Sequence, residues 1–542
     1  MNNTKTCADS IVDALITHGV DTIFGLPGAQ TYELIEALRK RKDEIRFIVS
    51  RHEQGAAYMA FGYAKSTGKV GVYTVVPGPG VLNTTAALCT SHNTKVLCLA
   101  GQIPSDFIGA GHGMLHELRD QLATLKTLCK WASRINHSAE VPTVMSDAFK
   151  QLNSGRPQPV AVEVPGDVLA MPADRNTEYP IADIPVWKPS PQNITEAAKL
   201  IATADNPTIM VGSGAMHAAD EVLELAKVIQ APVVSFRGGS GIVDARSPYA
   251  YNSAAGYSVW DKADLVIGIG SRLELPAFRW QDGKPRSILI RIDIDPTQMV
   301  RLKANVEIVA DSKLSTAALV SELQSMNLKR PDRSAEFQAV KDKAAIEVNK
   351  IQPQMSFLDT IREVLPEDGF LVEEISQMGF TAWFGFPFYS PGKFITSGYQ
   401  GNLGHGFQTA LGVKTGNPDT AVVSITGDGG FMFGVQELAT AVQYKISLVV
   451  ILFNNNAYGN VRRDQKNLYE DSYASDLRNP DFIALAKSFG AHTATATSPD
   501  ELKNILAEAL QTDDGPTFIE IPVETGSESS PWKFIMPAGY GK

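Results

Sequence analysis

The sequence predicts an α/β protein of three domains with parallel sheets, and three observations support this prediction. Apolar residues recur at helical spacing, as in residues 11–15 and 34–38, and these stretches alternate with short strand-like runs such as residues 22–24 and 70–76. Such alternation is typical of parallel sheets covered by helices. The chain has 542 residues, more than one hydrophobic core supports, and its 44% hydrophobic and 20% charged composition is that of a globular protein.

Two stretches divide the chain. Prolines punctuate the irregular segment from Met171 to Pro191, where the alternation of helices and strands breaks off. A polar, charged stretch from Leu328 to Asn349 is expected to form a long connecting helix and linker. We therefore expect domains at residues 1–180, 190–330 and 350–542, the first and third being candidates for one shared topology.

The central block opens with a strand over residues 208–211 that runs into Gly212-Ser213-Gly214, and later strands are expected at residues 233–235, 265–268 and 288–294. The glycine turn is similar to part of a dinucleotide-binding loop. The third glycine of that loop is missing, however, and no acidic partner stands at the expected distance. The turn by itself therefore disfavours nicotinamide binding.

Composition excludes several classes of partner. The net charge of -10 and the pI near 5.5 leave no basic stripe for nucleic acid. The four cysteines have no paired spacing, which argues against a zinc site or a disulfide framework. The polar N-terminus carries no apolar signal segment and the longest apolar run, residues 448–453, is too short to span a bilayer, so no membrane partner and a cytoplasmic location are expected.

The sharpest chemical signal lies in the C-terminal block. Gly427, Asp428, Gly429 and Gly430 follow an apolar strand over residues 421–426, a helix is expected around Glu437, and the next strand ends at Asn454-Asn455. Mg²⁺ prefers such oxygen ligands together with phosphate oxygens and water, and the glycines allow the backbone to approach a diphosphate. Alternatively, Asp428 caps a helix and the asparagines form a turn.

Two further segments carry candidate functional residues. Residues 51–57 follow a strand and begin a helix with Glu53 in its first turn, where a glutamate also complements the helix dipole. Residues 397–406 place Gly401 and Leu403 in a glycine-rich loop. Considered alone, Leu403 is a core leucine.

In this order, across nearly the whole chain, these segments resemble the thiamine diphosphate-dependent enzymes of the acetohydroxyacid (acetolactate) synthase and pyruvate oxidase branch. Asp428 and Asn455 stand 27 positions apart with Glu437 between them, which resembles the cofactor motif of that family. The loops at residues 24–30 and 78–83 resemble two loops of the family's first domain.

The resemblance implies a thiamine diphosphate-binding fold with an N-terminal pyrimidine-binding (PYR) domain, a Rossmann-like central domain and a C-terminal diphosphate-binding (PP) domain. It implies thiamine diphosphate and Mg²⁺ as cofactors. It also implies a homodimer or homotetramer, because the catalytic glutamate of one subunit meets the diphosphate domain of another. Several relatives bind FAD between the central and C-terminal domains, although no decisive flavin motif is visible in this sequence.

The resemblance also assigns roles to individual residues. The metal would be held by the side chains of Asp428 and Asn455 and the backbone carbonyl of Ala457. Glu53, as a buried carboxyl with a raised pKa, would protonate the aminopyrimidine so that the cofactor can lose its thiazolium proton. Leu403 would bend the cofactor, whose amino group would donate to the Gly401 carbonyl. Further cofactor contacts are implied at Gly427, Gly429, Gly430, Tyr458 and Gly459.

The substrate side is less specific. Its candidate residues are Gln30, Gln102, His112, His116 and Gln121. We group Gln30, His116 and Gln121 with Glu53 as catalytic candidates that orient an acceptor or relay protons, with packing or surface roles as the alternative for the histidines.

Two segments depart from the acetohydroxyacid synthase pattern. Residues 460–464 lack the expected tryptophan, and residues 376–379 read Ser-Gln-Met-Gly in place of a His-Gln-Met-Trp run. Arg462 and Arg463 fit an acidic substrate or an acyl-CoA phosphate, or simply form an exposed helical charge pair.

The leading functional hypothesis is a 2-oxoacid carboligase or decarboxylase, similar to acetolactate synthase, that acts on pyruvate or a related 2-oxoacid. The alternative is a carbon-carbon lyase for 2-hydroxyketones or 2-hydroxyacyl-CoA. A non-catalytic cofactor-binding protein is the third hypothesis, although it would have little need for Glu53, Asp428 and Asn455 together.

Overall fold

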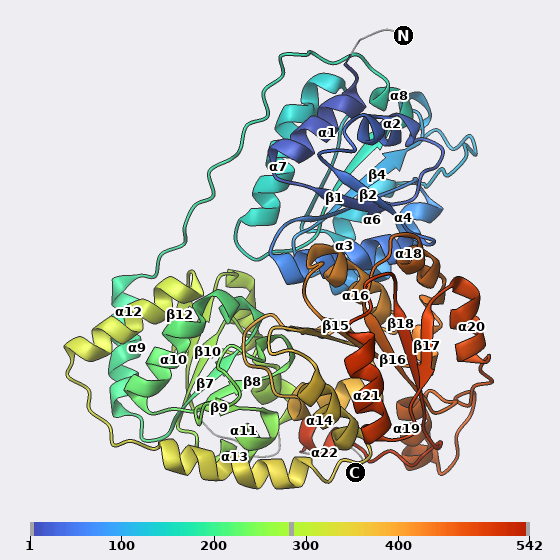
Figure 1. Ribbon diagram of the computed structural model, residues 1–542. Helices are drawn as coiled ribbons and strands as arrows, with labels where there is room; N and C mark the ends of the chain where they lie inside the picture. The colour runs from blue at the N-terminus through green and yellow to red at the C-terminus, as the bar shows by residue number, and fades with distance from the viewer. Residues whose placement is uncertain (1–4, 281–286, 538–542) are drawn as a thin grey trace.

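The computed structural model describes residues 5–280 and 287–537. The polar start of the chain, residues 1–4, therefore lies outside the described residues. Figure 1 shows three lobes, with the N-terminal part in blue, the central part in green to yellow and the C-terminal part in orange to red. Each lobe contains one six-stranded parallel sheet, which confirms the predicted α/β class.

The N-terminal sheet has the strand order β2-β1-β3-β4-β6-β5. Its strands are β1 (Thr22–Gly25), β2 (Arg46–Val49), β3 (Gly71–Val75), β4 (Val96–Gln102), β5 (Trp131–Arg134) and β6 (Val160–Pro165). The helices are α1 (Cys7–Thr17), α2 (Tyr32–Lys40), α3 (Glu53–Thr67), α4 (Pro79–Asn83), α5 (Thr85–Thr90), α6 (Gln121–Leu128), α7 (Val141–Asn153) and α8 (Gly166–Leu169).

The central sheet has the order β12-β11-β10-β7-β8-β9, which is the doubly wound order expected of a Rossmann-like domain. Its strands are β7 (Pro207–Val211), β8 (Val233–Ser235), β9 (Ala250–Tyr251), β10 (Leu265–Ile269), β11 (Ile288–Asp293) and β12 (Val306–Val309). The helices are α9 (Pro191–Thr203), α10 (Ala219–Ile229), α11 (Ser253–Ser258), α12 (Ser312–Ser325) and the connecting α13 (Ser334–Val348).

The C-terminal sheet has the order β14-β13-β15-β16-β18-β17, which repeats the N-terminal order strand for strand and confirms the shared topology. Its strands are β13 (Phe370–Glu373), β14 (Phe394–Ile395), β15 (Val422–Gly427), β16 (Val449–Asn454), β17 (His492–Thr495) and β18 (Thr517–Pro522). The helices are α14 (Gln354–Val364), α15 (Gln377–Gly385), α16 (Gly406–Gly416), α17 (Asp428–Phe431), α18 (Leu438–Gln443), α19 (Gly459–Tyr469), α20 (Phe482–Phe489), α21 (Pro499–Ala509) and α22 (Trp532–Ile535).

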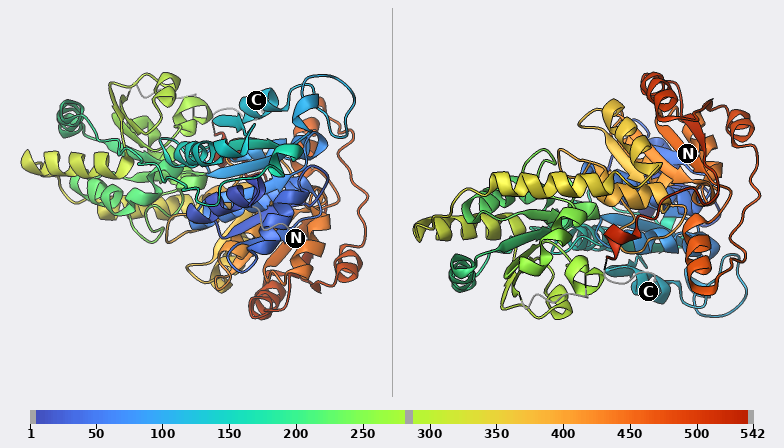
Figure 2. Two further views of the ribbon diagram at one scale, coloured as in Figure 1. Left: turned by 90° about the horizontal axis from the view of Figure 1, so that it is seen from above. Right: turned by 90° about the horizontal axis from the view of Figure 1, so that it is seen from below.

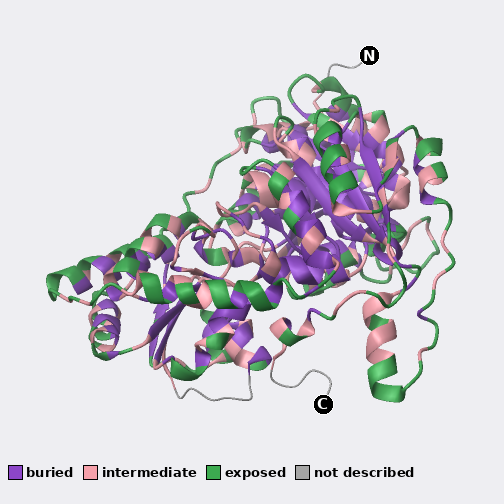
Figure 3. Cartoon of the chain, turned by 60° about the horizontal axis from the view of Figure 1, so that its bottom comes forward, coloured by how far each residue is buried: buried purple, intermediate pink, exposed green. Residues whose placement is uncertain are grey.

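Helices α3 and α16 join the N- and C-terminal sheets through one buried cluster of apolar side chains. The two backbones approach closely at glycines. A Cβ on Gly62 would lie 2.1 Å from the Thr409 carbonyl oxygen, and one on Gly412 would lie 1.9 Å from that of Met59. Figure 2 shows the central domain extending to one side of this joined pair, and Figure 3 shows the buried residues concentrated in the sheets.

The connections between the lobes are an extended segment and a long helix, α13. No helix or strand runs through residues 173–190, an extended segment that passes between the first two lobes. The helix expected around Glu437 is present as a turn of 3-10 helix at Val435–Glu437 followed by α18, and the short α17 precedes it directly after Gly427. Among the helices of residues 5–280 and 287–537, none combines the length and apolar character needed to cross a membrane.

Candidate active site

Asp428 and Asn455 meet at one edge of the C-terminal sheet. Asp428 follows β15 and Asn455 follows β16, and these strands pair in parallel with Gly427 opposite Phe453. Because parallel strands end at the same edge, the two side chains are brought together there. They are 2% and 9% exposed, so both are withdrawn from bulk water.

Ala457 completes this cluster. Its backbone N–H donates to Asn455 Oδ1 at 3.1 Å and also contacts the Asp428 carboxylate. Asn479 Nδ2 donates to Asp428 Oδ2 at 2.6 Å. The structure thus gathers all three predicted metal-binding residues, together with Asn479, which the sequence analysis missed.

The donors of this cluster fit a hard divalent cation. Burial is the main cause of a raised pKa at Asp428, and its hydrogen bonds to Asn479 and backbone N–H groups oppose that rise. No lysine or arginine forms an ion pair with it among the described residues. Within the described chain no three His, Cys, Asp or Glu side chains converge as a metal site. The candidate ligands here are the Asp428 carboxylate, the Asn455 amide and the Ala457 carbonyl, and Mg²⁺ usually takes its remaining ligands from phosphate and water.

The glycines of this cluster allow close packing that a side chain would prevent. A Cβ on Gly429 would lie 2.6 Å from Tyr458 Cε1, and one on Gly459 would lie 2.7 Å from Asn455 Nδ2. A Cβ on Gly430 would lie 2.6 Å from Glu374 Cγ. Residues 427–430, where β15 runs directly into α17, are therefore a glycine cradle packed closely against its neighbours, and N–H groups at the start of a helix are an arrangement that binds phosphate groups.

The loop that contains Leu403 lies between the C-terminal and N-terminal domains. Gly401 and Gly404 adopt positive φ values of 56° and 84°, which favours glycine at both positions. Asn402 is held from the N-terminal domain, where it donates to the Tyr58 hydroxyl and accepts from Thr90 Oγ1. Leu403 itself is half-buried, so one side of it remains accessible.

Glu53 is placed at the first turn of α3, as predicted. His52 caps the helix, and Glu53 Oε2 accepts from Asn83 Nδ2 at 3.0 Å. The Glu53 side chain is 18% exposed. Glu437 holds the same helix end from the C-terminal domain, because its carboxylate accepts from the backbone N–H groups of Arg51 and His52 at 3.0–3.1 Å.

Gln30 and His116 form one unit above the N-terminal sheet. Gln30 Oε1 lies 3.1 Å from His116 Nδ1, and Gln30 Nε2 donates to the Leu115 carbonyl at 3.0 Å. Both residues have positive φ, 65° and 69°. Because Nδ1–H donates to Gln30 in this pairing, the other imidazole nitrogen of His116 is left as an acceptor.

Gln121 has a different environment from the one expected of a substrate-facing residue. It is buried at the start of α6, where Oε1 accepts from Gly78 N at 2.8 Å and Nε2 donates to Gly101 O and to Glu163 Oε2, both at 2.9 Å. A Cβ on Gly78 would lie 2.4 Å from the His116 carbonyl oxygen. Gln121 therefore anchors the turn on which His116 rests.

The remaining substrate-side candidates are not brought into this unit. Gln102 is buried, with Oε1 accepting from Ile103 N and Nε2 donating to Glu163. His112 is exposed beside the ring of Phe107. Both fit the packing and surface alternatives better than contact with a substrate.

The C-terminal segment reaches back to the Asp428 cluster. Glu528 Oε2 accepts from Asn455 Nδ2 at 2.7 Å, and its pKa is raised by burial and by the nearby Asp428 charge. Glu528 lies far along the chain and no motif identified it. Of the two arginines on α19, Arg462 pairs with Asp476, and Arg463 donates to Asn460 and Asp464, so both are held locally.

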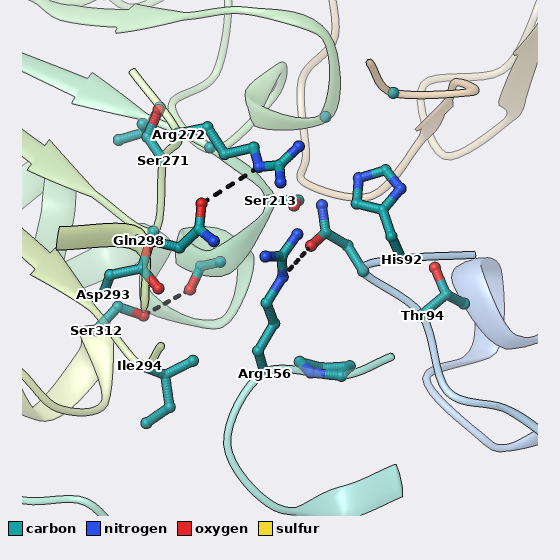
Figure 4. A pocket seen from close by; sticks show the side chains of 18 of the residues that line it. His92, Thr94, Arg156, Ser213, Ser271, Arg272, Asp293, Ile294, Gln298 and Ser312 are labelled. Atoms are coloured by element: carbon teal, nitrogen blue, oxygen red, sulfur yellow. Dashed lines mark hydrogen bonds between the residues drawn. The ribbon is translucent and has the colours of Figure 1, made fainter. Parts of the chain in front are cut away.

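A second site is a cavity of about 710 Å³ between all three domains. Figure 4 shows Ser213, Ser271, Asp293 and Ser312 of the central domain around it, opposite Arg156 and His92 of the N-terminal domain. The residues that line the cavity from the ends of the central strands are Gly212–Gly214 after β7, Gly270–Arg272 after β10, Asp293 in β11 and Asp311–Ser312 after β12.

This cavity alters the interpretation of the Gly212 turn. Gly212 and Gly270 pack back to back, since a Cβ on Gly212 would lie 2.5 Å from the Gly270 carbonyl oxygen. An acidic residue is present after all: Asp293 enters from β11, too distant in sequence for the spacing rule to detect. Arg272 stacks on Tyr399, with its Cζ 3.9 Å from the centre of the ring, and the pair gives the cavity an aromatic and cationic side.

Comparisons with known proteins agree with this arrangement. Residues 5–124 match the model described as the N-terminal TPP binding domain of thiamine pyrophosphate enzymes, residues 194–319 match their central domain, and residues 374–521 match their C-terminal TPP binding domain. The chain is 32% identical to a probable 2-ketoarginine decarboxylase of Pseudomonas aeruginosa, covering 96% of this chain and 94% of the relative.

Acetolactate synthases are similar over the same extent. The chain is 32% identical to a probable acetolactate synthase large subunit of Methanocaldococcus jannaschii, covering 98% of this chain and 94% of the relative. It is 29% identical to an acetolactate synthase large subunit of Haemophilus influenzae, covering 97% and 95%.

Proposed function

Since the chain belongs to the thiamine pyrophosphate enzyme family, we propose that it is a Mg²⁺-dependent 2-oxoacid carboligase or decarboxylase, similar to acetolactate synthase, with pyruvate or a related 2-oxoacid as donor. The observation that carries the Mg²⁺ assignment is the convergence of Asp428, Asn455 and Ala457 beside a glycine cradle. The relatives named for a decarboxylase and for acetolactate synthases support both outcomes of the reaction. Domain boundaries at residues 1–180, 190–330 and 350–542 belong to the same proposal.

Each residue at the PP site has a proposed task. Asp428, Asn455 and the Ala457 carbonyl hold the metal, and the amides around Gly427, Gly429 and Gly430 bind the diphosphate. Tyr458 and Gly459 border the cradle, while Gly401 and Leu403 contact the organic rings. When bound, thiamine diphosphate supplies a nucleophilic carbon that attacks the carbonyl of the substrate.

The N-terminal residues act on protons and orientation. Glu53 holds a proton at the pyrimidine ring, and Asn83 fixes the orientation of its carboxyl. Gln30 orients His116, whose free nitrogen faces the substrate. Gln121, first grouped with the catalytic residues, is instead proposed as a positioning residue for the Gly78 turn.

The first test is a substrate panel with purified protein, thiamine diphosphate and Mg²⁺. We expect release of carbon dioxide from pyruvate or a larger 2-oxoacid, with the ligated products separating synthase from decarboxylase. Glu53→Gln should lower kcat at least about 100-fold while cofactor binding persists, because general acid-base groups contribute factors of this order. Absence of carbon dioxide from every 2-oxoacid contradicts the proposal.

The alternative lyase function has one specific observation in its favour. The 710 Å³ cavity carries Arg156 and Arg272, which suit the diphosphate of an ADP moiety such as that of coenzyme A. Cleavage of a 2-hydroxyacyl-CoA without release of carbon dioxide would establish this function. Cleavage of plain hydroxyketones alone would support a lyase that does not use the cavity for substrate.

The same cavity is our proposed site for FAD. Its volume lies within the range of cofactor pockets, and its strand-end glycines and Asp293 suit a dinucleotide. We expect flavin absorbance in the purified protein, or uptake of FAD by the protein purified without it. Arg272→Ala should weaken that uptake and leave thiamine diphosphate binding intact.

We propose a homodimer, or a homotetramer built from dimers, with Glu53 of one subunit completing the PP site of the other. Exposed apolar side chains flank both halves of the site: Leu82 beside Asn83, and Met432 and Phe433 directly after α17. Such surfaces commonly mark interfaces between proteins.

Mixing two inactive variants tests this assembly. Glu53→Gln and Asp428→Asn chains each lack one half of the site. If sites form between subunits, co-refolding them in equal amounts restores about one quarter of wild-type activity, because half of the dimers are mixed and each mixed dimer has one intact site. No recovery despite mixed dimers detected by mass spectrometry shows that each chain builds its own site.

A further inference from the structure

The feature that goes furthest beyond the proposed roles is Glu374, the residue directly after β13. Its side chain is 1% exposed, yet its carboxylate makes three hydrogen bonds to backbone N–H groups. Oε1 accepts from Ile375 at 2.9 Å, and Oε2 accepts from Gly404 at 3.1 Å and from Gly406 at 3.0 Å. Gly404 and Gly406 follow Leu403 in the chain, so this carboxylate holds the end of the Leu403 loop.

Glu374 also contacts the diphosphate turn. A Cβ added to Gly430 would lie 2.6 Å from Glu374 Cγ, and a Cβ added to Gly406 would lie 3.0 Å from Glu374 Cβ. One side chain therefore packs between the turn that follows Asp428 and the loop that carries Leu403. Neither segment is adjacent to Glu374 in sequence, so only the fold brings the three together.

We propose that Glu374 is a positioning residue that sets the distance between the Leu403 loop and the diphosphate turn before any cofactor binds. This inference rests on the proposed function, because that function assigns the organic rings to the loop and the diphosphate to the turn. The loop and the turn must bind the two parts of one cofactor at the same time. If their spacing is already fixed, binding does not carry the entropic cost of ordering a glycine-rich loop.

The chemistry requires a carboxylate at this position. Three N–H donors converge on two oxygens, and a carboxylate offers acceptors on both. A glutamine would turn its NH₂ group towards either Ile375 or the glycine amides, so that a buried donor would face another donor. Burial raises the pKa of Glu374 to about 7, and the N–H groups of Gly406, Ile375 and Gly404 oppose that rise because they favour the charged acceptor, which makes stronger bonds than an amide oxygen does.

Hydrogen exchange of the protein without cofactor tests this inference directly. In Glu374→Gln the amides of Gly404 and Gly406 should exchange about tenfold faster than in wild type, because a hydrogen bond that protects them is lost. Glu373→Gln is the matched control: it alters the neighbouring buried carboxyl at the end of β13, which accepts from Trp383 Nε1 of α15 and from the Ser397 N–H at the start of the loop, so exchange at Gly404 and Gly406 should stay at the wild-type rate.

Two further measurements connect the loop to the cofactor. Calorimetry should show weaker thiamine diphosphate binding by Glu374→Gln, by about tenfold. NMR should show slower exchange in D₂O of the thiazolium hydrogen of the bound cofactor, whereas Glu373→Gln should leave both unchanged. Gly430→Ala, which pushes on Glu374 from the turn, should also loosen the loop, and it provides an independent variant if Glu374→Gln does not fold.

The outcomes separate the two proposals. Wild-type protection at Gly404 and Gly406 in both Glu374→Gln and Gly430→Ala overturns the positioning role, and so does faster exchange with unchanged cofactor affinity. Failure of the wild-type protein to bind thiamine diphosphate would instead overturn the proposed function, while the exchange data from the cofactor-free protein would still report on the loop.

Discussion

At the scale of single residues, three acidic side chains are buried at one edge of the C-terminal sheet. Asp428, Glu374 and Glu373 all lie at the carboxyl edge of the same sheet, and each is almost fully withdrawn from water. Charged groups are buried in this way only where hydrogen bonds or cations compensate. Asp428 accepts from Asn479, and Glu374 accepts from three backbone amides. Glu373 Oε2 accepts from Trp383, whereas its Oε1 is buried without a hydrogen-bond partner.

Glu373 leads to a prediction about pH. Burial raises its pKa to about 8 from the ordinary value of 4.5, against the opposing effect of Arg237. The folded state therefore keeps a proton that the unfolded state releases above about pH 4.5. The stability from this group is complete at low pH and is lost as the pH rises through about 8.

We expect the free energy of unfolding of the wild type to fall between about pH 4.5 and pH 8, and to fall less in Glu373→Gln, whose amide stays neutral throughout. Urea unfolding at several pH values measures both curves. Parallel curves for the two proteins would show that Glu373 does not titrate in this range.

At the scale of elements, the close packing of α3 on α16 joins the N- and C-terminal domains of one chain. Glu53 begins α3, and the Leu403 loop ends where α16 begins. The backbones meet at Gly62 and Gly412, so the spacing of the helices depends on the absence of side chains there. A change at either glycine is therefore transmitted to residues that lie some distance away.

Gly62→Ala tests this dependence. Replacing a glycine inside a helix by alanine usually stabilises the helix. Here, however, the added methyl group would lie 2.1 Å from the Thr409 carbonyl oxygen. Overpacking of this kind costs about 1–3 kcal/mol, so we expect a lower free energy of unfolding despite the helix preference.

Gly515→Ala is the control, because nothing lies within 4 Å of its added Cβ. Denaturant titration of the two variants compares them directly. If Gly62→Ala and the wild type have equal free energies of unfolding, α3 and α16 can move apart to accommodate the methyl group without loss of stability, and the contact between them is not tight.

At the scale of the whole molecule, the site is spread over segments from several parts of the chain, so ligands should stabilise the folded state globally. At 100 times its dissociation constant, a ligand that binds only the folded protein adds about 2.7 kcal/mol to the free energy of unfolding. We expect such a rise with thiamine diphosphate and Mg²⁺ together, and its loss when the metal is chelated.

Differential scanning calorimetry with and without a chelator measures this effect. Asp428→Asn should show little stabilisation, since the amide lacks the charge that the metal requires. A full rise in Asp428→Asn would place the metal elsewhere.

The sequence by itself determined whatever depends on local order. The alternation of apolar residues at helical and at strand spacing indicated the three parallel sheets. Glycines next to side chains with oxygen ligands at the ends of strands indicated the Asp428 and Asn455 pair. These signals are readable because the residues stand directly at the ends of strands, and parallel strands must end at a common edge. The cofactor class followed from that pattern and from the Glu53 segment.

Only the tertiary structure decided which distant residues serve these local motifs. Asn479, Glu528 and Glu374 reach the site from separate segments, and Asp293 enters the second cavity from a strand far from its glycine turn. It also decided that Gln121 is a buried anchor while Gln30 holds His116. Side-chain environments depend on packing between elements, and periodicity along one chain does not encode which elements become neighbours.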